Sequence, residues 1–239
     1  APVVTAARGS TLGVITDYAP HMQSRVYVHG RDFRASGGGT QGFSWSGREW
    51  NLDGLTSNLT GLYQLENLSV ALAALEALFL DRDIEISEAS VRSGLADIRW
   101  PGRLETLRES PPLILDSAHN PAGGKALVKS LRALYPGTKF AFLVGMLDDK
   151  QHAPFLKEIA GIAGKLIITE VPSSRTTPAE KLLEAAAKHL TCEIKVVPDY
   201  AEAYDKLLRI DEPSCIAGSI YLAGAIRKLL QTGERPGVL

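Results

Sequence analysis

The sequence contains few of the residues that mark several large classes of protein. Its 239 residues include two cysteines, Cys192 and Cys215, too few and too far apart for a disulfide framework or a cysteine metal site. Lysine and arginine (26) nearly balance aspartate and glutamate (27), and no basic block is present. Because nucleic-acid-binding proteins carry a clustered positive charge, we expect no nucleic-acid partner.

Long apolar runs are also missing. No stretch approaches the roughly 20 apolar residues that a membrane span needs, and the first eleven residues lack the apolar centre of a signal peptide. We therefore expect no membrane partner and a cytoplasmic location. The first residue is Ala1 rather than methionine, which suggests that the chain is a fragment.

Apolar residues make up 45% of the chain, enough for a sizeable core. Residues 12–18, 25–35 and 43–52 have the composition of short strands, with Ser46 and Gly47 placed as a hairpin turn. We predict a small antiparallel sheet in this region. The glycines at 37–39 are interpreted as a turn, because a phosphate loop needs a following helix and a Lys-Ser/Thr pair.

Two helices are expected next. Residues 61–80 carry apolar side chains at helical spacing, and residues 87–98 follow the same pattern with Ser87 as a candidate N-cap. The sequence "WPGR" at 100–103 then interrupts the pattern, because Pro101 and Gly102 disfavour both a helix and a central strand. We interpret it as a hinge.

From residue 111 onward, apolar strands alternate with amphipathic helices. The predicted strands are 112–116, 139–146, 165–171, 193–197 and 214–219, and the predicted helices are 121–134, 153–163, 178–190, 201–210 and 221–230. Such alternation is typical of a mainly parallel sheet that is covered on both faces. The predicted fold class is α/β: a Rossmann-like, mainly parallel C-terminal domain that follows a small antiparallel β plus helical region.

Ligands of open α/β sheets bind beyond the carboxyl ends of the strands, which directs attention to Asp116, His119 and Asn120. Asn120 can cap a helix that starts at Pro121, which would leave backbone N–H groups for an anion. Asp116 has two interpretations: it binds a hydroxylated ligand such as a ribose, or it accepts hydrogen bonds from loop amides. His119 would contact a phosphate or carboxylate, or merely pack at the loop surface.

The common catalytic motifs do not occur. There is no Walker A loop, dinucleotide fingerprint, nucleophile elbow, histidine-rich metal pair or Cys-His dyad, and we expect no metal ligands in this chain. The fold alone would identify this region only as a ligand-binding α/β domain, because one fold can host many functions.

Five motifs in sequence carry a family resemblance. "GLYQLEN", "WPGRLE", "LILDSAHNP", "VGMLDDK" and "AGSIYLAG" occur in this order between residues 61 and 224. Together they resemble the C-terminal half of folylpolyglutamate synthase and dihydrofolate synthase, members of the Mur-ligase superfamily. The resemblance implies that residues 1–100 are the C-terminal part of an ATPase domain and residues 101–239 a glutamate ligase domain.

The resemblance also implies an activity. Such an enzyme is an ATP-dependent amide ligase, in which ATP phosphorylates a folate or dihydropteroate carboxylate and the amine of L-glutamate attacks the acyl phosphate. Mg²⁺ would neutralise the phosphates.

Five residues of this chain match functional positions of the family. The resemblance places Asn67 near the adenine, Arg103 at the ATP phosphates and Asp116 at the ribose, as cofactor-binding residues. His119 and Lys150 match positions near the phosphates or the incoming glutamate and are the candidate catalytic residues.

Each match has a simpler alternative. Asn67 would be an amide on a helix surface, Arg103 would pair with Glu105 or lie in water, and Lys150 would be a solvated charge beside acidic neighbours. Ser219 is expected to cap the last helix rather than contact a ligand.

The resemblance is incomplete in one respect. The family's glycine-rich phosphate loop, its magnesium ligands and its folate-binding residues have no match in this sequence. We therefore expect the isolated chain to be inactive without a missing N-terminal region of the same protein. Two other functions stay open: a Mur ligase of peptidoglycan synthesis, and a non-catalytic nucleotide-binding module.

Overall fold

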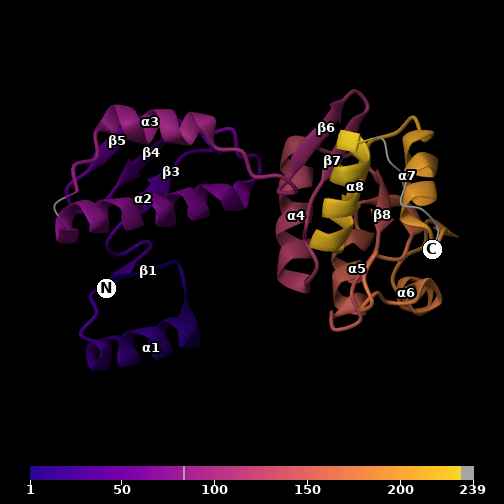
Figure 1. The fold of residues 1–239 in the computed structure, drawn as a ribbon, viewed down its shortest axis with the longest axis horizontal. Coiled ribbons are helices and arrows are strands. Elements are labelled where there is room, and N and C mark those ends of the chain that lie inside the picture. The colour runs from indigo at the N-terminus through magenta and orange to yellow at the C-terminus, as the bar shows by residue number, and fades with distance from the viewer. Residues whose placement is uncertain (83, 233–239) are drawn as a thin grey trace. The chain divides into compact units, whose positions relative to one another are not determined.

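The computed structural model describes residues 1–82 and 84–232. The chain divides into two compact units, Ala1–Arg99 and Trp100–Leu239. Figure 1 shows the helices and strands of both units. Within the described residues, no helix is long and apolar enough to cross a membrane.

The first unit begins with a short parallel strand pair, β1 (Val3–Thr5) and β2 (Val26–Val28). Between them lie helix α1 (Gly9–Tyr18) and the short 3-10 helix η1 (Ala19–Met22). The strand expected at 12–18 is therefore wrong. Its apolar residues also fit a helical period, and Thr16 accommodates the helix because its hydroxyl donates to the carbonyl of Leu12 at 3.1 Å.

The predicted antiparallel sheet is present with three strands, β3 (Arg34–Ser36), β4 (Gln41–Ser46) and β5 (Asn51–Thr56). Residues 37–39 form the turn between β3 and β4, and residues 47–50 close the predicted hairpin. The segment 25–35, expected to be one strand, is split between β2 and β3, which belong to different sheets.

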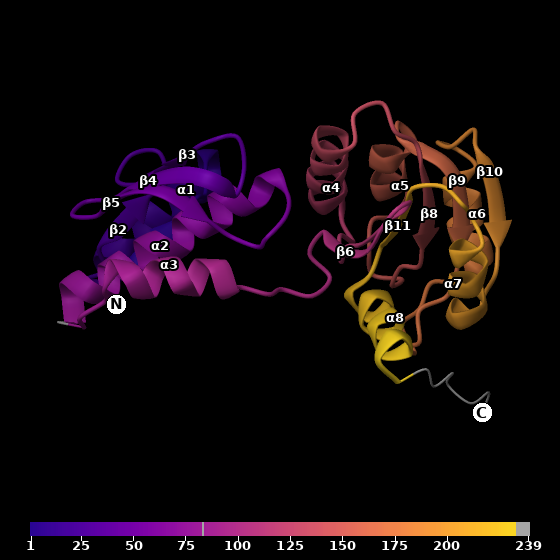
Figure 2. The ribbon, with the colours of Figure 1, turned by 90° about the horizontal axis from the view of Figure 1, so that it is seen from above.

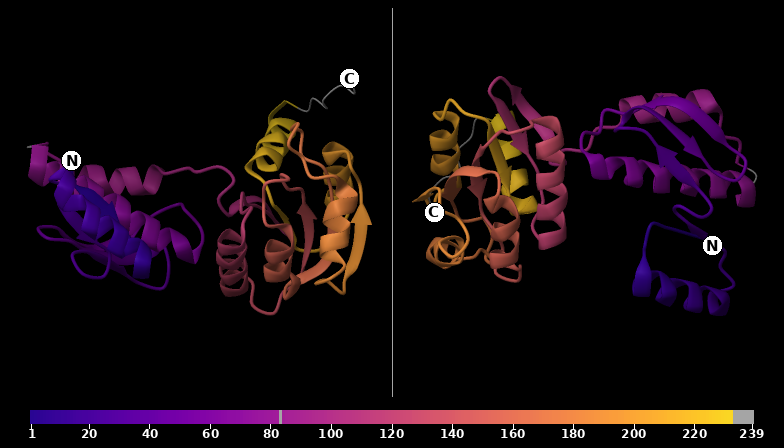
Figure 3. Two further views of the ribbon diagram at one scale, coloured as in Figure 1. Left: turned by 90° about the horizontal axis from the view of Figure 1, so that it is seen from below. Right: turned by 180° about the vertical axis from the view of Figure 1, so that it is seen from behind.

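Helices α2 (Leu62–Arg82) and α3 (Glu88–Asp97) pack on this sheet, as Figure 3 shows. Ser87 caps α3 as expected, and its side chain accepts from the N–H of Ser90 at 3.1 Å. The core between sheet and helices contains Phe43, Trp45 and Leu72.

The second unit is built on a six-stranded sheet in the order β10-β9-β8-β11-β7-β6. Its strands are β6 (Glu105–Glu109), β7 (Pro112–Leu115), β8 (Phe140–Val144), β9 (Ala163–Ile168), β10 (Glu193–Val196) and β11 (Ser214–Ala217). All neighbours are parallel except β6 and β7. The mainly parallel sheet is confirmed, whereas β6 was not expected, because its polar sequence "ETLRE" has none of the apolar character of the other strands.

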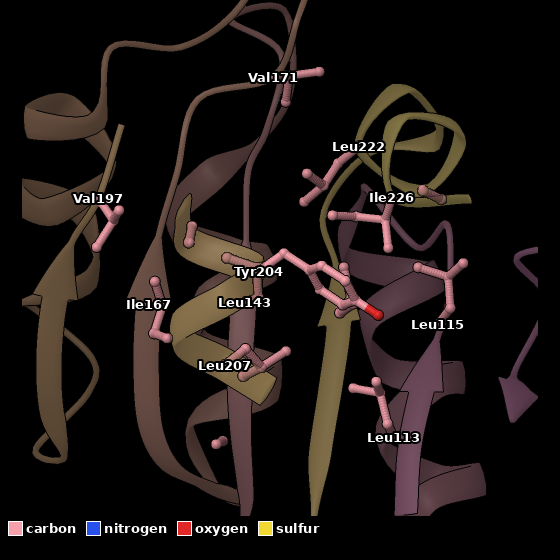
Figure 4. Packing of buried hydrophobic residues seen from close by; sticks show 14 of the residues in the cluster. Leu113, Leu115, Leu143, Ile167, Val171, Val197, Tyr204, Leu207, Leu222 and Ile226 are labelled. Carbon is pink, nitrogen blue, oxygen red and sulfur yellow. The ribbon is translucent and has the colours of Figure 1, made fainter. Parts of the chain in front are cut away.

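The predicted helices of this unit are also present. They are α4 (Pro121–Leu134), α5 (His152–Ala160), α6 (Ala179–Ala186), α7 (Tyr200–Leu208) and α8 (Ile220–Thr232). Leu113, Leu143 and Ile167 point to one face of the sheet, where they pack against Tyr204 of α7 and Ile226 of α8 (Figure 4). Helices α4 and α5 lie side by side on the opposite face (Figure 2). Both faces are therefore covered.

Strand order creates a switch point. The chain passes from β7 through α4 to β8, and β11 later inserts between these two strands. The helix after β7 and the helix after β11 leave toward opposite faces, which opens the carboxyl edge of the sheet at this position.

Candidate functional site

Three loops meet at the carboxyl edge of the second unit, after β7, β8 and β11. The N–H of Gly218 donates to the carbonyl of Ala118 at 2.7 Å, which joins the loops after β11 and β7. Gly218 has φ of +105°, and a Cβ added there would lie 2.7 Å from the carbonyl oxygen of Gly145 in the loop after β8. Only glycine fits this position without displacing the neighbouring backbone.

Asp116 follows the last residue of β7 and is buried, with 3% of its surface exposed. Its Oδ1 accepts from the N–H of Ala118 and its Oδ2 from the N–H of Leu104, both at 2.8 Å. Asp116 thus accepts hydrogen bonds from loop amides, which is one of the two interpretations offered by the sequence. The role at a ribose stays a prediction.

His119 lies further along the same loop and is half-buried. Its Nδ1 is 2.9 Å from the carbonyl oxygen of Ser117. A carbonyl only accepts, so Nδ1 carries the proton and Nε2 is left for another partner.

The start of α4 is capped as the sequence predicts, since Asn120 Oδ1 accepts from the N–H of Gly123 at 2.8 Å and Pro121 is the first helical residue. The carbonyl of Asn120 also accepts from the N–H of Gly124. The predicted cap is therefore confirmed, and the bond from Gly124 is the first regular hydrogen bond of the helix; an anion at this helix start stays a prediction.

Arg103 lies in a turn that precedes β6, and its side chain is half-buried. It has no hydrogen-bond or ion-pair partner among the residues that the structure describes. Glu105, the partner that the sequence offered, pairs instead with Arg227 of α8. The cation of Arg103 is thus left unneutralised within its own unit.

The loop after β8 carries a group of charges. Lys150 Nζ lies 2.9 Å from Asp149 Oδ2, and Lys181 pairs with Asp148 at 2.5 Å. Hydrogen bonding to Lys150 lowers the pKa of Asp149, and hydrogen bonding to Lys181 lowers the pKa of Asp148. Lys150 is therefore placed at the carboxyl edge, but it is paired.

Two further polar pairs at this edge were missed by the sequence analysis. The Nε2 of His152 lies 3.0 Å from the hydroxyl of Thr177, and Arg175 donates to the hydroxyl of Tyr221 at 3.1 Å while stacking over its ring. These partners are 25 and 46 residues apart in the chain, and no sequence motif links them.

Asn67 lies in the first unit, on an exposed position of α2. Its Nδ2 donates to Oε1 of the buried Gln64 at 2.8 Å, so the amide is oriented by its own helix. Ser219 behaves as expected at the start of α8, where its hydroxyl accepts from the N–H of Tyr221 at 3.0 Å.

Residues 102–224, just over half of the chain, match the family described as "Mur ligase, glutamate ligase domain". The chain belongs to this family. The matched segment contains Arg103, Asp116, His119 and Lys150, so the glutamate ligase domain of this chain includes four of the five candidate residues.

Three proteins that are similar to this Mur ligase family member are all named folylpolyglutamate synthase. The folylpolyglutamate synthase of Lacticaseibacillus casei is 28% identical over 196 residues, which are 81% of this chain and 44% of that protein. Among solved structures, the folylpolyglutamate synthase of Thermotoga maritima has a TM-score of 0.80 at 32% identity and is matched over 98% of this chain and 55% of its own. That of Mycobacterium tuberculosis, complexed with ADP and AMPPCP, has a TM-score of 0.85 at 25% identity and the same coverage.

The chain spans about half the length of these relatives. Their shared name supports the resemblance to folylpolyglutamate and dihydrofolate synthases that the five motifs carried.

Proposed function

We propose that this Mur ligase family member handles the nucleotide and L-glutamate in an ATP-dependent amide ligase that extends folate or dihydropteroate. The proposal depends on one observation: the side chain of Arg103 has no partner among the described residues of its unit. The turn that contains Arg103 is hydrogen-bonded to the loop after β7. An unneutralised guanidinium near the carboxyl edge of an α/β sheet is suited to a phosphate chain. The nucleotides bound by the Mycobacterium tuberculosis relative support the same ligand class.

The cofactor-binding roles are divided among three residues. Arg103 would pair with the phosphates, and Asn67 would offer its exposed amide to the adenine. Asp116 would accept a ribose hydroxyl, because each carboxylate oxygen can accept more than one hydrogen bond.

His119 and Lys150 are proposed to act on the reacting groups. The Nε2 of His119 is available to a phosphate or carboxylate, since Nδ1 is committed to Ser117. Lys150 would exchange Asp149 for an anionic ligand, at little cost because exposed ion pairs are weak. Preorganised donors of this kind stabilise the charge that develops during acyl and phosphoryl transfer.

The proposed Mg²⁺ would accompany ATP, with its protein ligands mostly outside this chain. The described residues contain no group of three or more His, Cys, Asp or Glu side chains that would hold a metal ion. Mg²⁺ bound to ATP supplies phosphate neutralisation in such ligases, and we assign no Mg²⁺ ligand to this chain.

The test separates binding from catalysis. ATP with Mg²⁺ is titrated into the chain by calorimetry, and Arg103→Ala is expected to weaken binding about tenfold or more, the loss of a charged hydrogen bond. Arg209→Ala is the matched control, because Arg209 follows α7 and precedes β11, at the opposite edge of the sheet. Equal affinities of wild type and Arg103→Ala would refute the role of Arg103.

Catalysis is measured as glutamate-dependent ADP release. We expect none from the chain alone, and release from the complete gene product with a dihydropteroate or folate acceptor. Release with a UDP-muramoyl acceptor instead would indicate the peptidoglycan alternative, and ATP binding without turnover on either acceptor would indicate a non-catalytic module. The names of the relatives favour the folate branch; a cytoplasmic location is part of the same proposal.

A further inference from the structure

The backbone on both sides of Arg103 is fixed. The N–H of Gly102 donates to Glu105 Oε2 at 2.8 Å, and the carbonyl of Gly102 accepts from both the N–H and the hydroxyl of Ser117. On the other side, the N–H of Leu104 donates to Asp116. Arg103 therefore lies between two anchored residues while its own side chain has no partner among the described residues.

The anchored turn adopts an uncommon backbone conformation. Gly102 has φ of +69° and Leu104 has φ of +47°. A left-handed conformation costs an L-residue such as leucine about 1–2 kcal/mol, so the surrounding contacts must hold it. The side chain of Leu104 is 1% exposed, and its burial supplies one of those contacts.

Glu105 supplies another contact and connects the turn to a distant helix. One carboxylate oxygen accepts from the N–H of Gly102, and the other pairs with the guanidinium of Arg227 on α8. The two side chains are only 24% and 29% exposed, so solvent screens the pair less than it screens a surface pair. Arg227 thereby fixes the orientation of the carboxylate that holds the turn.

A fixed turn matters for an arginine that binds phosphate. A side chain on a mobile segment loses conformational freedom when it binds, and this loss weakens affinity; a preorganised segment avoids most of it. We infer that Glu105, oriented by Arg227, is a positioning residue that presents Arg103 to the phosphates of the nucleotide. The inference rests on the proposed nucleotide-binding function.

The experiment is a double-mutant cycle on ATP affinity, with ATP and Mg²⁺ titrated into the chain. Glu105→Ala and Arg227→Met are each expected to weaken ATP binding about three- to tenfold, the range for ordering one long side chain. In the Arg103→Ala background the same substitutions are expected to have no further effect, because the residue that they position is gone. Glu105→Gln retains an acceptor for the N–H of Gly102 and should recover part of the affinity.

A second measurement reads the turn directly. Amide hydrogen exchange of Gly102 and Leu104 should accelerate in Glu105→Ala while exchange in β8 stays unchanged. Glu212→Ala is the matched control, since Glu212 forms an exposed pair with Lys165 in the same unit; it should leave both readouts unchanged.

The outcomes distinguish the two proposals. An equal loss from Glu105→Ala with and without Arg103 would show a general effect on folding and would overturn the positioning role. If Arg103→Ala loses ATP binding and Glu105→Ala keeps it, the positioning role of Glu105 is overturned while the proposed function stands. If wild type binds no ATP, the proposed function fails and this role of Glu105 fails with it.

Discussion

Leu104 donates its backbone N–H to Asp116 Oδ2 at 2.8 Å, although the two residues are twelve positions apart. The other oxygen of Asp116 accepts from Ala118. This buried carboxylate thus joins the turn that carries Arg103 to the loop that carries His119, together with the hydrogen bonds from Ser117 to the carbonyl of Gly102.

Replacing this carboxylate with an amide should weaken the junction. Asp116→Asn offers one acceptor oxygen instead of two, so one buried N–H would face an NH₂ group, at a cost of about 1–3 kcal/mol. We expect faster amide exchange at Leu104 and along β7. Asp211→Asn, at an exposed position of the same unit, should change stability by less than about 0.5 kcal/mol; similar effects of the two substitutions would contradict the assignment.

Glu76 should be essential for the first unit. It is 3% exposed, and its carboxylate accepts from the N–H groups of Arg48, Glu49 and Trp50 at 3.0, 2.8 and 2.8 Å. Glu76→Ala leaves these hairpin amides unsatisfied, and we expect a loss of about 3 kcal/mol or more. Urea unfolding followed by tryptophan fluorescence measures it, because Trp45 and Trp50 lie in this unit.

The control for this prediction lies on the same helix. Glu66 forms an exposed pair with Arg8, and Glu66→Ala should cost no more than about 0.5 kcal/mol. A small effect of Glu76→Ala would mean that the hairpin turn is held by other contacts.

Two glycine substitutions should separate steric clash from backbone strain. Gly218 and Gly137 both have positive φ, but a Cβ at Gly137 would meet nothing within 4 Å, whereas one at Gly218 would meet the backbone of Gly145. Gly137→Ala should lower the free energy of unfolding by about 1–2 kcal/mol, because it introduces backbone strain without a steric clash. Gly218→Ala should cost at least about 2 kcal/mol more and weaken ATP binding; equal unfolding free energies would argue against contact between the loops after β8 and β11.

The cysteines should differ in reactivity. Burial raises the pKa of both thiols, and that of Cys215 lies well above its ordinary value, with the charge of Asp116 as a second cause. The thiolate is the reactive form, so Cys192 should label slowly and faster as pH rises, while Cys215 should label only after unfolding. Thiol labelling with and without urea tests this order.

The same shift predicts a pH dependence of stability. The raised pKa of Cys215 means that the folded state retains the thiol proton when the unfolded chain loses it. Its contribution to the free energy of unfolding is therefore complete below the ordinary thiol pKa of about 8.5 and is lost as pH rises above it. Stability that increases through this range would contradict the burial of Cys215.

Much of the second unit follows from local pattern. The continuous apolar character of Phe140–Val144 and the amphipathic spacing of Pro121–Leu134 identify a buried strand and a surface helix without further information. Caps are equally local, because Ser87 and Asn120 bond to amides three residues away. Local pattern does not identify short or polar elements in this way. Strand β6 lacks an apolar run, and α1 has a composition compatible with a strand or a helix.

In the candidate site, too, some features follow from the sequence and others only from the tertiary structure. The family motifs identified Arg103, Asp116, His119 and Lys150, and the five repeats of strand and helix placed the last three beyond strand ends. Sequence by itself could not decide that Glu105 pairs with Arg227, 122 residues away, rather than with Arg103. It also could not decide that β11 inserts between β7 and β8. Local pattern determines which residues form each element, whereas strand order and long-range hydrogen bonds depend on how whole elements pack, and only the tertiary structure determines which side chains meet.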